Sequence, residues 1–299
     1  MKEASARSNP DGAFKRIVFA TDFLESSRLA LDYAVAFAHH YGARLTIVHA
    51  FELPSEAEEV EMISHRPSLS REHASARLEA FAAGVRRLGI DTVIELRVGE
   101  PCPSILASAA DNNADLLVLG THGIYRGLQH VLVGSNAEKI LQSAPCPTLT
   151  VGRHVMAGVD LQLKLSSILF IADTSPGSAS VAHYADSLGH SLGIPVEPIL
   201  VLPDYVALDE NSAHRAIEKY CSDLRALPSP LHHDWYDPAF LRNKTASADD
   251  IIARAIGCAD VLLVLGVQEQ SVWKRHLHVS FAFELIARSG CPVLSLRAH

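Results

Sequence analysis

Two apolar runs of the sequence end in residues that could contact a ribose or a base. The first run begins at Ile17 and ends in Ala20-Thr21-Asp22, and the second ends in His49-Ala50. A carboxylate such as that of Asp22 is a natural acceptor for ribose hydroxyls in dinucleotide sites. Aspartate also forms turns and helix caps, so a ligand contact and a turn role for Asp22 both stay open.

A third segment combines glycines with the start of a predicted helix. Gly120 and Gly123 would let the backbone turn tightly and approach a ligand closely. Gly134 and Ser135 open a helix whose free N–H groups and dipole favour phosphate. Ser135 and Glu138 also fit the S-x-x-E capping box, so a purely structural role is the alternative.

His122 lies inside the turn between the first two of these glycines. It either touches a phosphate or is an exposed loop residue, and the sequence leaves both roles open. None of these short motifs is specific alone, because such matches often arise by chance. Together, in the right strand contexts, they favour a phosphorylated ligand.

The elements that must position these residues alternate between strand and helix patterns. We predict strands at 17–20, 45–48, 92–98, 116–119 and 147–151, and helices at 30–41, 78–88, 104–112 and 135–143. Five strands with intervening helices predict a parallel, doubly wound α/β sheet with helices on both faces. In such a sheet, ligands bind beyond the carboxyl ends of the strands, where the strand order reverses.

The second half of the chain repeats the first. Ile17–Asp22 matches Ile168–Asp173, and Leu117–Gly120 matches Leu263–Gly266. The last helix of each half leads to a Cys-Pro pair and a final apolar strand, at Cys146 and at Cys291. A repeat of this length indicates duplication. We therefore expect two tandem α/β domains, at 14–152 and 165–299. A flexible leader at 1–13 precedes the first domain, and a linker at 153–164 joins the two.

The stretch GTHGIYRGLQHVLVGSNAEKILQSAPCPTLTV resembles the signature of the universal stress protein family. The segments FKRIVFATDF and LTIVHAFELP are similar to the first two strands of that family, so the resemblance covers nearly the whole chain as two domains in tandem. It implies an adenine-nucleotide alpha-hydrolase-like fold. Many members bind ATP through a Gly-x2-Gly-x9-Gly-Ser/Thr pattern, which implies ATP, alone or with Mg²⁺, as the ligand here.

The resemblance assigns individual positions to this ligand. It implies phosphate contacts from the glycine segment and the helix that follows, at Gly120, Gly123, Gly134, Ser135, Asn136 and Ala137. It implies adenosine contacts near Ala20, Thr21, Asp22 and Ala50. His122, between the glycines, completes the candidate set.

Two departures from the family pattern bear on this assignment. Ten residues, Ile124 to Val133, separate Gly123 from Gly134, where the family pattern has nine. In the second half, Glu269 and Val279 stand where those two glycines would be. A carboxylate repels a triphosphate, and a β-branched residue cannot adopt the positive φ of a glycine. We therefore expect a nucleotide site in the first domain only.

Other classes of site are less well supported. The histidine clusters at 39–40, 232–233 and 276–278 lack the spacing of a zinc site, so we interpret them as surface histidines and predict no metal site. The five cysteines form no CxxC pair, and Cys146 and Cys291 are interpreted as small buried hydrophobes. No P-loop, nucleophile elbow or kinase motif is present in the sequence.

Composition narrows the partners and the compartment. The net charge of −8 argues against nucleic acid, which needs clustered Lys and Arg. No apolar run approaches the roughly 18 residues of a membrane span, and the polar N-terminus and odd cysteine count favour a cytoplasmic protein.

We expect the protein to work by binding and signalling in a stress response rather than by turnover. A nucleotide-independent interaction scaffold and a slow ATP hydrolase are the alternatives. Because the final strand of each copy would otherwise leave an unpaired edge, 147–151 and 292–296 are predicted to meet as an internal pseudo-dimer. Whether whole chains form a homodimer stays open.

Overall fold

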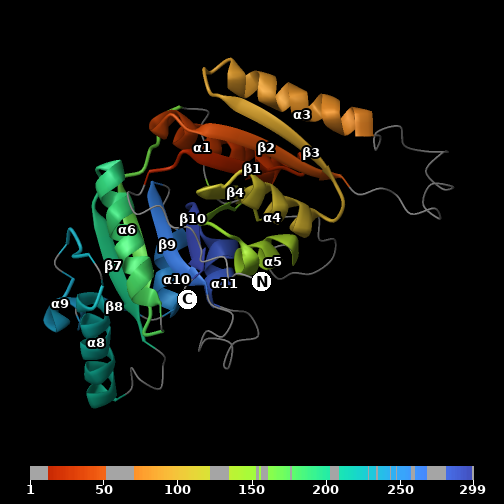
Figure 1. Ribbon diagram of the computed structural model, residues 1–299. Helices are drawn as coiled ribbons and strands as arrows, with labels where there is room; N and C mark the ends of the chain where they lie inside the picture. The colour runs from red at the N-terminus through yellow and green to blue at the C-terminus, as the bar shows by residue number, and fades with distance from the viewer. Residues whose placement is uncertain are drawn as a thin grey trace.

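In a computed structural model, most of the chain forms an α/β fold. One sheet of parallel and antiparallel strand pairs has helices on both faces (Figure 1). The described residues are 13–51, 71–121, 135–152, 155 and 161–297, except for 176, 203–208, 228, 234, 243, 247, 257–259 and 268–280. Within these residues no helix is long and apolar enough to cross a membrane. The predicted leader at 1–13 and linker at 153–164 lie mostly outside the described residues.

The first half alternates strands and helices as the hydrophobic pattern predicts. Its elements are β1 (Arg16–Ala20), α1 (Glu25–Tyr41), β2 (Arg44–Phe51), α3 (Arg71–Arg86), β3 (Thr92–Val98), α4 (Pro101–Asp111), β4 (Leu116–Gly120), α5 (Ser135–Ser143) and β5 (Thr148–Val151). Helix α4 begins three residues before the predicted start at Ser104. Pro101 explains this, because proline is favoured in the first helical turn, where its missing N–H costs nothing.

The second half follows the same sequence of elements with one addition. It contains β6 (Ser167–Ala172), α6 (Ser178–Leu192), β7 (Val196–Val201), α8 (Glu210–Arg225), α9 (Pro238–Arg242), β8 (Thr245–Ala246), α10 (Ala248–Ile256), β9 (Val261–Val267), α11 (Phe281–Arg288) and β10 (Val293–Arg297). The addition is α9, which has no counterpart among the described elements of the first half.

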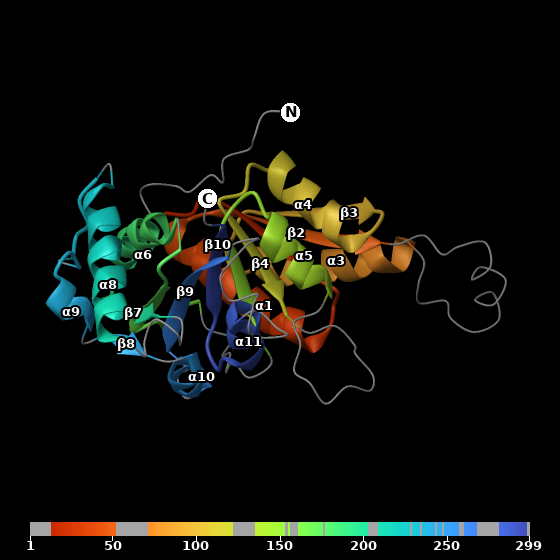
Figure 2. The ribbon, with the colours of Figure 1, turned by 90° about the horizontal axis from the view of Figure 1, so that it is seen from below.

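The ten strands form one sheet in the order β3-β2-β1-β4-β5-β10-β9-β6-β7-β8. Each half therefore uses the same order around its first strand, and all pairings within a half are parallel. The predicted fold class, two tandem doubly wound five-stranded sheets, is confirmed. The two halves lie side by side along the sheet, with α3 towards one end and α8 and α9 towards the other (Figures 1 and 2).

The two halves meet through their final strands. Strand β5 pairs with β10 in antiparallel fashion, with Leu149 opposite Leu294 and Thr150 opposite Val293. The hydroxyl of Thr150 donates a further hydrogen bond to the carbonyl of Val293 at 3.1 Å. The internal pairing of the two final strands, predicted from the duplication, is thus present, and each copy supplies the partner for the other's edge.

Side chains alternate between two cores, one on each face of the sheet. Phe19 and Phe170 lie in the core beneath α1, α3, α6 and α8, whereas their neighbours Val18 and Leu169 lie in the opposite core. This alternation follows from the period of two along a strand. Each core contains residues of both halves, so both cores run across the seam between the copies.

The halves differ in how the helix after the second strand connects to the third strand. In the first half, residues 87–91 join α3 to β3. In the second half, residues 226–244 join α8 to β8, and this longer connection, hereafter the insert, contains α9. The sequence comparison did not detect the insert, because the matched motifs lie on either side of it.

Candidate functional site

Among the described residues, Ala20, Thr21, Asp22, Ala50 and Gly120 lie at or just beyond the carboxyl ends of β1, β2 and β4. Strand β1 lies between β2 and β4, with Ala20 opposite Val48 on one side and Leu119 on the other. The connections from β1 and from β4 lead to opposite sides of this point in the strand order, which is where open α/β sheets bind ligands.

Thr21 is the buried centre of the turn that follows β1. Its side chain is 6% exposed, and its hydroxyl accepts a hydrogen bond from the amide of Phe23 at 2.9 Å. Ser27 donates its own proton to the carbonyl of Leu24 at 2.8 Å, so at the 3.1 Å contact between the two hydroxyls Thr21 is the donor. Thr21 therefore shapes the turn and does not offer a free hydroxyl to a ligand.

Asp22 is exposed beside Thr21 and has the turn role, one of the two roles that the sequence left open. Its Oδ1 atom accepts a hydrogen bond from the amide of Leu24 at 2.9 Å, which is an Asx turn. Its second oxygen has no hydrogen-bond partner among the described residues. The matching Asp173 forms the same turn with the amide of Ser175 at 3.1 Å. A turn role for Asp22 thus leaves one carboxylate oxygen for a ligand.

Phe23 holds a strained backbone conformation. Its φ of 63° lies in the left-handed region, where a bulky side chain is rare. Such a conformation costs of order 1–3 kcal/mol and persists where the surroundings enforce it, commonly at functional sites. The matching residue of the second half, Thr174, has no positive φ. The strained turn is therefore confined to the first half.

His49, at the end of β2, fixes the same turn from the other side. Its Nδ1 atom lies 2.7 Å from the carbonyl of Thr21, so Nδ1 carries the proton and donates it. Burial lowers the pKa of His49, the bond to Thr21 raises it, and the charge of Arg77 lowers it further. The ring is therefore neutral at pH 7, with Nε2 as a hydrogen-bond acceptor.

Two side chains of α3 pack on the Phe23 ring. The guanidinium carbon of Arg77 lies 4.3 Å from the centre of the ring, a cation–π contact. Phe81 meets the ring edge-on at 5.5 Å between centroids, and His49 lies 4.4 Å away. Helix α3 is thereby fastened to the strained turn at the edge of the sheet.

The second half has lost the polar part of this arrangement. Strand registers match Ile17 with Leu45 in one half and Ile168 with Val196 in the other. Leu200 therefore stands where the first half has His49, and it is fully buried. In the same register, Ala172 stands where the first half has Thr21. The hydrogen bond between ring and carbonyl cannot form there.

Gly120 is required by packing at this edge. A Cβ atom at Gly120 would lie 2.7 Å from the backbone carbon of Ser26 and 2.9 Å from the amide nitrogen of Ser27. The glycine thus lets the first turn of α1 approach the end of β4. From the sequence, we attributed Gly120 to the close approach of a ligand. In the structure, the protein's own backbone at Ser26 and Ser27 approaches Gly120 closely.

The remaining predicted residues divide between the core, the surface and the segments that are not described. Ala20 and Ala137 are buried in the same core, Ala50 is half-buried, and Ser135 and Asn136 are exposed in the first turn of α5. His122, Gly123 and Gly134 lie outside the described residues, as does the loop in which the sequence shows an extra residue. Glu269 and Val279 of the second half also lie outside them.

His232 and His233, interpreted from the sequence as surface histidines, lie at the surface and also contact a buried carboxylate. Their side chains are half-exposed, at 49% and 38%, but both Nδ1 atoms contact the buried carboxylate of Asp186, at 2.8 and 2.6 Å. Cys146 and Cys291 are buried, as predicted. Within the described part of the chain, no group of histidine, cysteine and acidic residues is arranged to hold a metal ion.

The sequence did not single out Phe23 and Arg77, and it gave His49 no specific role. A phenylalanine after Thr-Asp carries no sign of a positive φ, because φ depends on the packing around the turn. Arg77 comes from a helix whose pairing with β1 no local pattern reveals. The position of His49 at a strand end was the one available signal.

Comparisons with known proteins place the chain in a family. The sequence model of the universal stress protein family matches residues 13–152. A universal stress protein from Thermus aquaticus is 34% identical over 140 residues, which cover 46% of this chain and 98% of that protein.

Solved structures extend the likeness to the second half. A universal stress protein from Archaeoglobus fulgidus aligns over 97% of this chain and 98% of its own, with a TM-score of 0.66 and 19% identity, which shows a shared fold. A universal stress protein solved in complex with cAMP aligns over 46% of this chain and 97% of its own, with a TM-score of 0.37 and 25% identity. The chain belongs to the universal stress protein family.

Proposed function

We propose that the first half binds an adenine nucleotide at the carboxyl edge of β1 and β4 and that the protein acts through this binding in a stress response. The observation that carries the proposal is the turn after β1. It is strained at Phe23, braced by Thr21 and His49, and presents a carboxylate oxygen of Asp22. Stored strain at the point where strand order reverses favours a functional site over a plain connection.

In this proposal, Asp22 accepts a hydrogen bond from a ribose hydroxyl through its second oxygen, while the first oxygen holds the turn. Ala50 lies at the neighbouring end of β2, where the backbone can border the base. The phosphates extend towards the first turn of α5, where Ser135 and Asn136 are exposed and the helix dipole favours negative charge. Mg²⁺ would accompany the phosphates.

The second half is proposed to have no nucleotide site. Leu200 and Ala172 replace the two residues that brace the turn, and no positive φ occurs at Thr174. Glu269 adds a negative charge to the loop that would face the phosphates.

Binding rather than turnover is proposed, because the Nδ1 proton of His49 is donated to the carbonyl of Thr21 and the ring packs against Phe23. In this proposal His49 acts as a brace for the turn.

Thermal melting of the full chain with and without ATP tests the proposal. A ligand that binds only the folded state adds about 2.7 kcal/mol of stability at 100 times its Kd, so the melting temperature rises with ATP concentration. Gly123→Glu, which copies Glu269 of the second half, should abolish this rise. Glu269→Gln, at the matched position, should leave it unchanged. cAMP and GTP are titrated alongside, to test the preference for adenine.

An unchanged melting temperature at millimolar ATP would overturn the proposal and favour an interaction scaffold with two vestigial sites. A rise that survives in Gly123→Glu would show that the phosphates lie elsewhere. Release of ADP from ATP during the titration would contradict binding without turnover.

A further inference from the structure

The insert of the second half is longer than a connection needs to be. Residues 226–244 span the same step, from helix to edge strand, that residues 87–91 make in the first half. Connections longer than about 12–15 residues in compact domains are commonly functional. The insert therefore calls for an explanation beyond chain connectivity.

A buried carboxylate fastens the insert to α6. Asp186 is 1% exposed and accepts hydrogen bonds from the amide of His232 at 2.6 Å and from the rings of His232 and His233. The His232 ring also stacks on that of His190 of α6, 4.2 Å away. A buried charge is costly unless it is fully hydrogen-bonded, so this network anchors His232 and His233 to α6.

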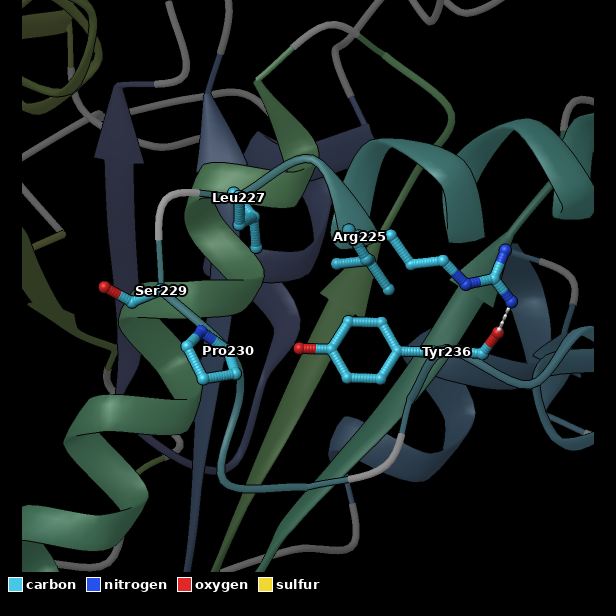
Figure 3. A pocket seen from close by; sticks show the side chains of 6 residues that line it. Arg225, Leu227, Ser229, Pro230 and Tyr236 are labelled. Carbon is cyan, nitrogen blue, oxygen red and sulfur yellow. Dashed lines mark hydrogen bonds between the residues drawn. The ribbon is translucent and has the colours of Figure 1, made fainter.

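The insert and the end of α8 together line an open surface pocket of about 480 Å³ (Figure 3). Its apolar wall consists of Leu224, Leu227, Pro230 and the ring of Tyr236, and its polar groups are Arg225 and Ser229. This volume lies within the roughly 300–1,000 Å³ of small-molecule sites. A flat apolar body would fit against the half-buried ring of Tyr236, which lies across the pocket in Figure 3.

The polar groups of the pocket are mainly hydrogen-bond donors. One Nη2 proton of Arg225 goes to the carbonyl of Tyr236 at 2.6 Å, and no carboxylate among the described residues forms an ion pair with this guanidinium. The hydroxyl of Tyr236 accepts from the amide of Leu231 at 2.7 Å, which leaves its proton without an acceptor among the described residues. A ligand that completes this set must supply oxygen acceptors and negative charge.

We propose that the second half binds a small organic anion in this pocket, namely a carboxylate attached to a flat apolar ring system. The carboxylate meets the guanidinium of Arg225, which lies at the backbone end of Tyr236 (Figure 3). The ring system lies against Leu224, Leu227 and Pro230. The two halves of the chain would then take different ligands, a nucleotide in the first and an aromatic carboxylate in the second.

Titration of the full chain with 2-naphthoate, followed by NMR, tests this proposal. Trp235, next to Tyr236 in sequence, is buried against Phe170 and His233, so its indole N–H signal reports on the insert. Trp273→Phe assigns that signal, because the chain has two tryptophans. We expect a saturable shift with 2-naphthoate. 2-Naphthalenemethanol, which has the same rings without the charge, should bind about tenfold or more weakly.

Arg225→Gln should weaken 2-naphthoate binding about tenfold or more, because it removes the charge and the fork of donors. Arg215→Gln, on the exposed side of the same helix where Arg215 donates a hydrogen bond to Ser212, is the matched control and should bind as the wild type does. If Arg225→Gln fails to fold, Arg225→Lys keeps the charge and should retain the preference for the carboxylate over the alcohol.

No saturable shift, equal affinity for the acid and the alcohol, or an equal loss in Arg215→Gln would each overturn the proposal. Displacement of 2-naphthoate by ATP would also overturn it, because the probe would then occupy the nucleotide site. These outcomes are independent of whether the first half binds ATP.

Discussion

At the scale of single residues, the two halves have kept the same turn and changed what supports it. Asp22 and Asp173 both accept the amide two residues ahead. Only the first half adds the bond from His49 to Thr21 and the strained φ of its next residue. Both copies therefore share the aspartate turn, whereas the strained φ of Phe23 and the bond from His49 occur in the first copy alone among the described residues.

Replacing Asp186 should lower the free energy of unfolding of the second half. Asp186→Asn leaves fewer acceptors for the three donors of His232 and His233, so we expect a loss of about 1–3 kcal/mol at pH 7. Urea unfolding measures this change. Asp223→Asn, in an exposed pair with Lys219 at 3.0 Å, is the control and should cost less than about 0.5 kcal/mol.

The shifted pKa of Asp186 predicts that the stability of the protein depends on pH. Burial raises the pKa of Asp186, but the hydrogen bonds from His232 and His233 outweigh this and lower it below the ordinary value of 3.8. A lowered folded pKa gives stability that is fully present above the unfolded value and is lost as the pH falls through the folded one. Acid unfolding of Asp186→Asn should lack this component. An identical acid transition in both proteins would contradict it.

At the scale of elements, the contact between α1 and β4 depends on a single missing side chain. Gly120→Ala places a Cβ atom 2.7 Å from the backbone of Ser26, where only a backbone shift can relieve it. We expect a loss of about 1–3 kcal/mol and weaker ATP binding, because the turn after β1 must move with α1.

Gly84→Ala is the matched control for this change. Gly84 lies in α3, and an added Cβ would meet no atom within 4 Å, so alanine should stabilise the protein by about 0.5–1 kcal/mol. Thermal melting of the two variants should therefore move in opposite directions. Equal effects would mean that the contact between α1 and β4 is looser than described.

The order and type of these elements were predictable, because strands such as β1 and β4 are continuous apolar runs and helices such as α1 carry a clear period. The insert was not predictable, since its anchor pairs Asp186 with residues 46 and 47 positions away in the sequence. The candidate site was predictable at Asp22, from its place after a strand. The contacts of His49 and Arg77 with the turn could not be predicted, because they depend on how separate elements pack together.

At the scale of the whole molecule, the antiparallel pair of β5 and β10 makes one structural unit of two copies. Leu149, which is fully buried and opposite Leu294, stands at the centre of this seam. Leu149→Ala should cost about 2–5 kcal/mol. Because both cores run across the seam, hydrogen exchange should show β1 and β6 losing protection together.

Leu88→Ala is the control for this change, since Leu88 is 41% exposed and should cost less than about 0.5 kcal/mol. Retained protection of β6 when β1 exchanges freely in Leu149→Ala would show that the halves unfold separately. The continuous cores would then not couple them.

The most direct test of the central claim, one nucleotide site in two homologous halves, is calorimetric titration of the full chain with ATP. We expect a binding stoichiometry of one ATP per chain. Asp22→Asn, which keeps the turn acceptor but removes the charge, should weaken binding about tenfold or more, while Asp173→Asn, its exact counterpart in the second half, should bind as the wild type does. Two ATP per chain, none, or equal loss in both variants would contradict the account.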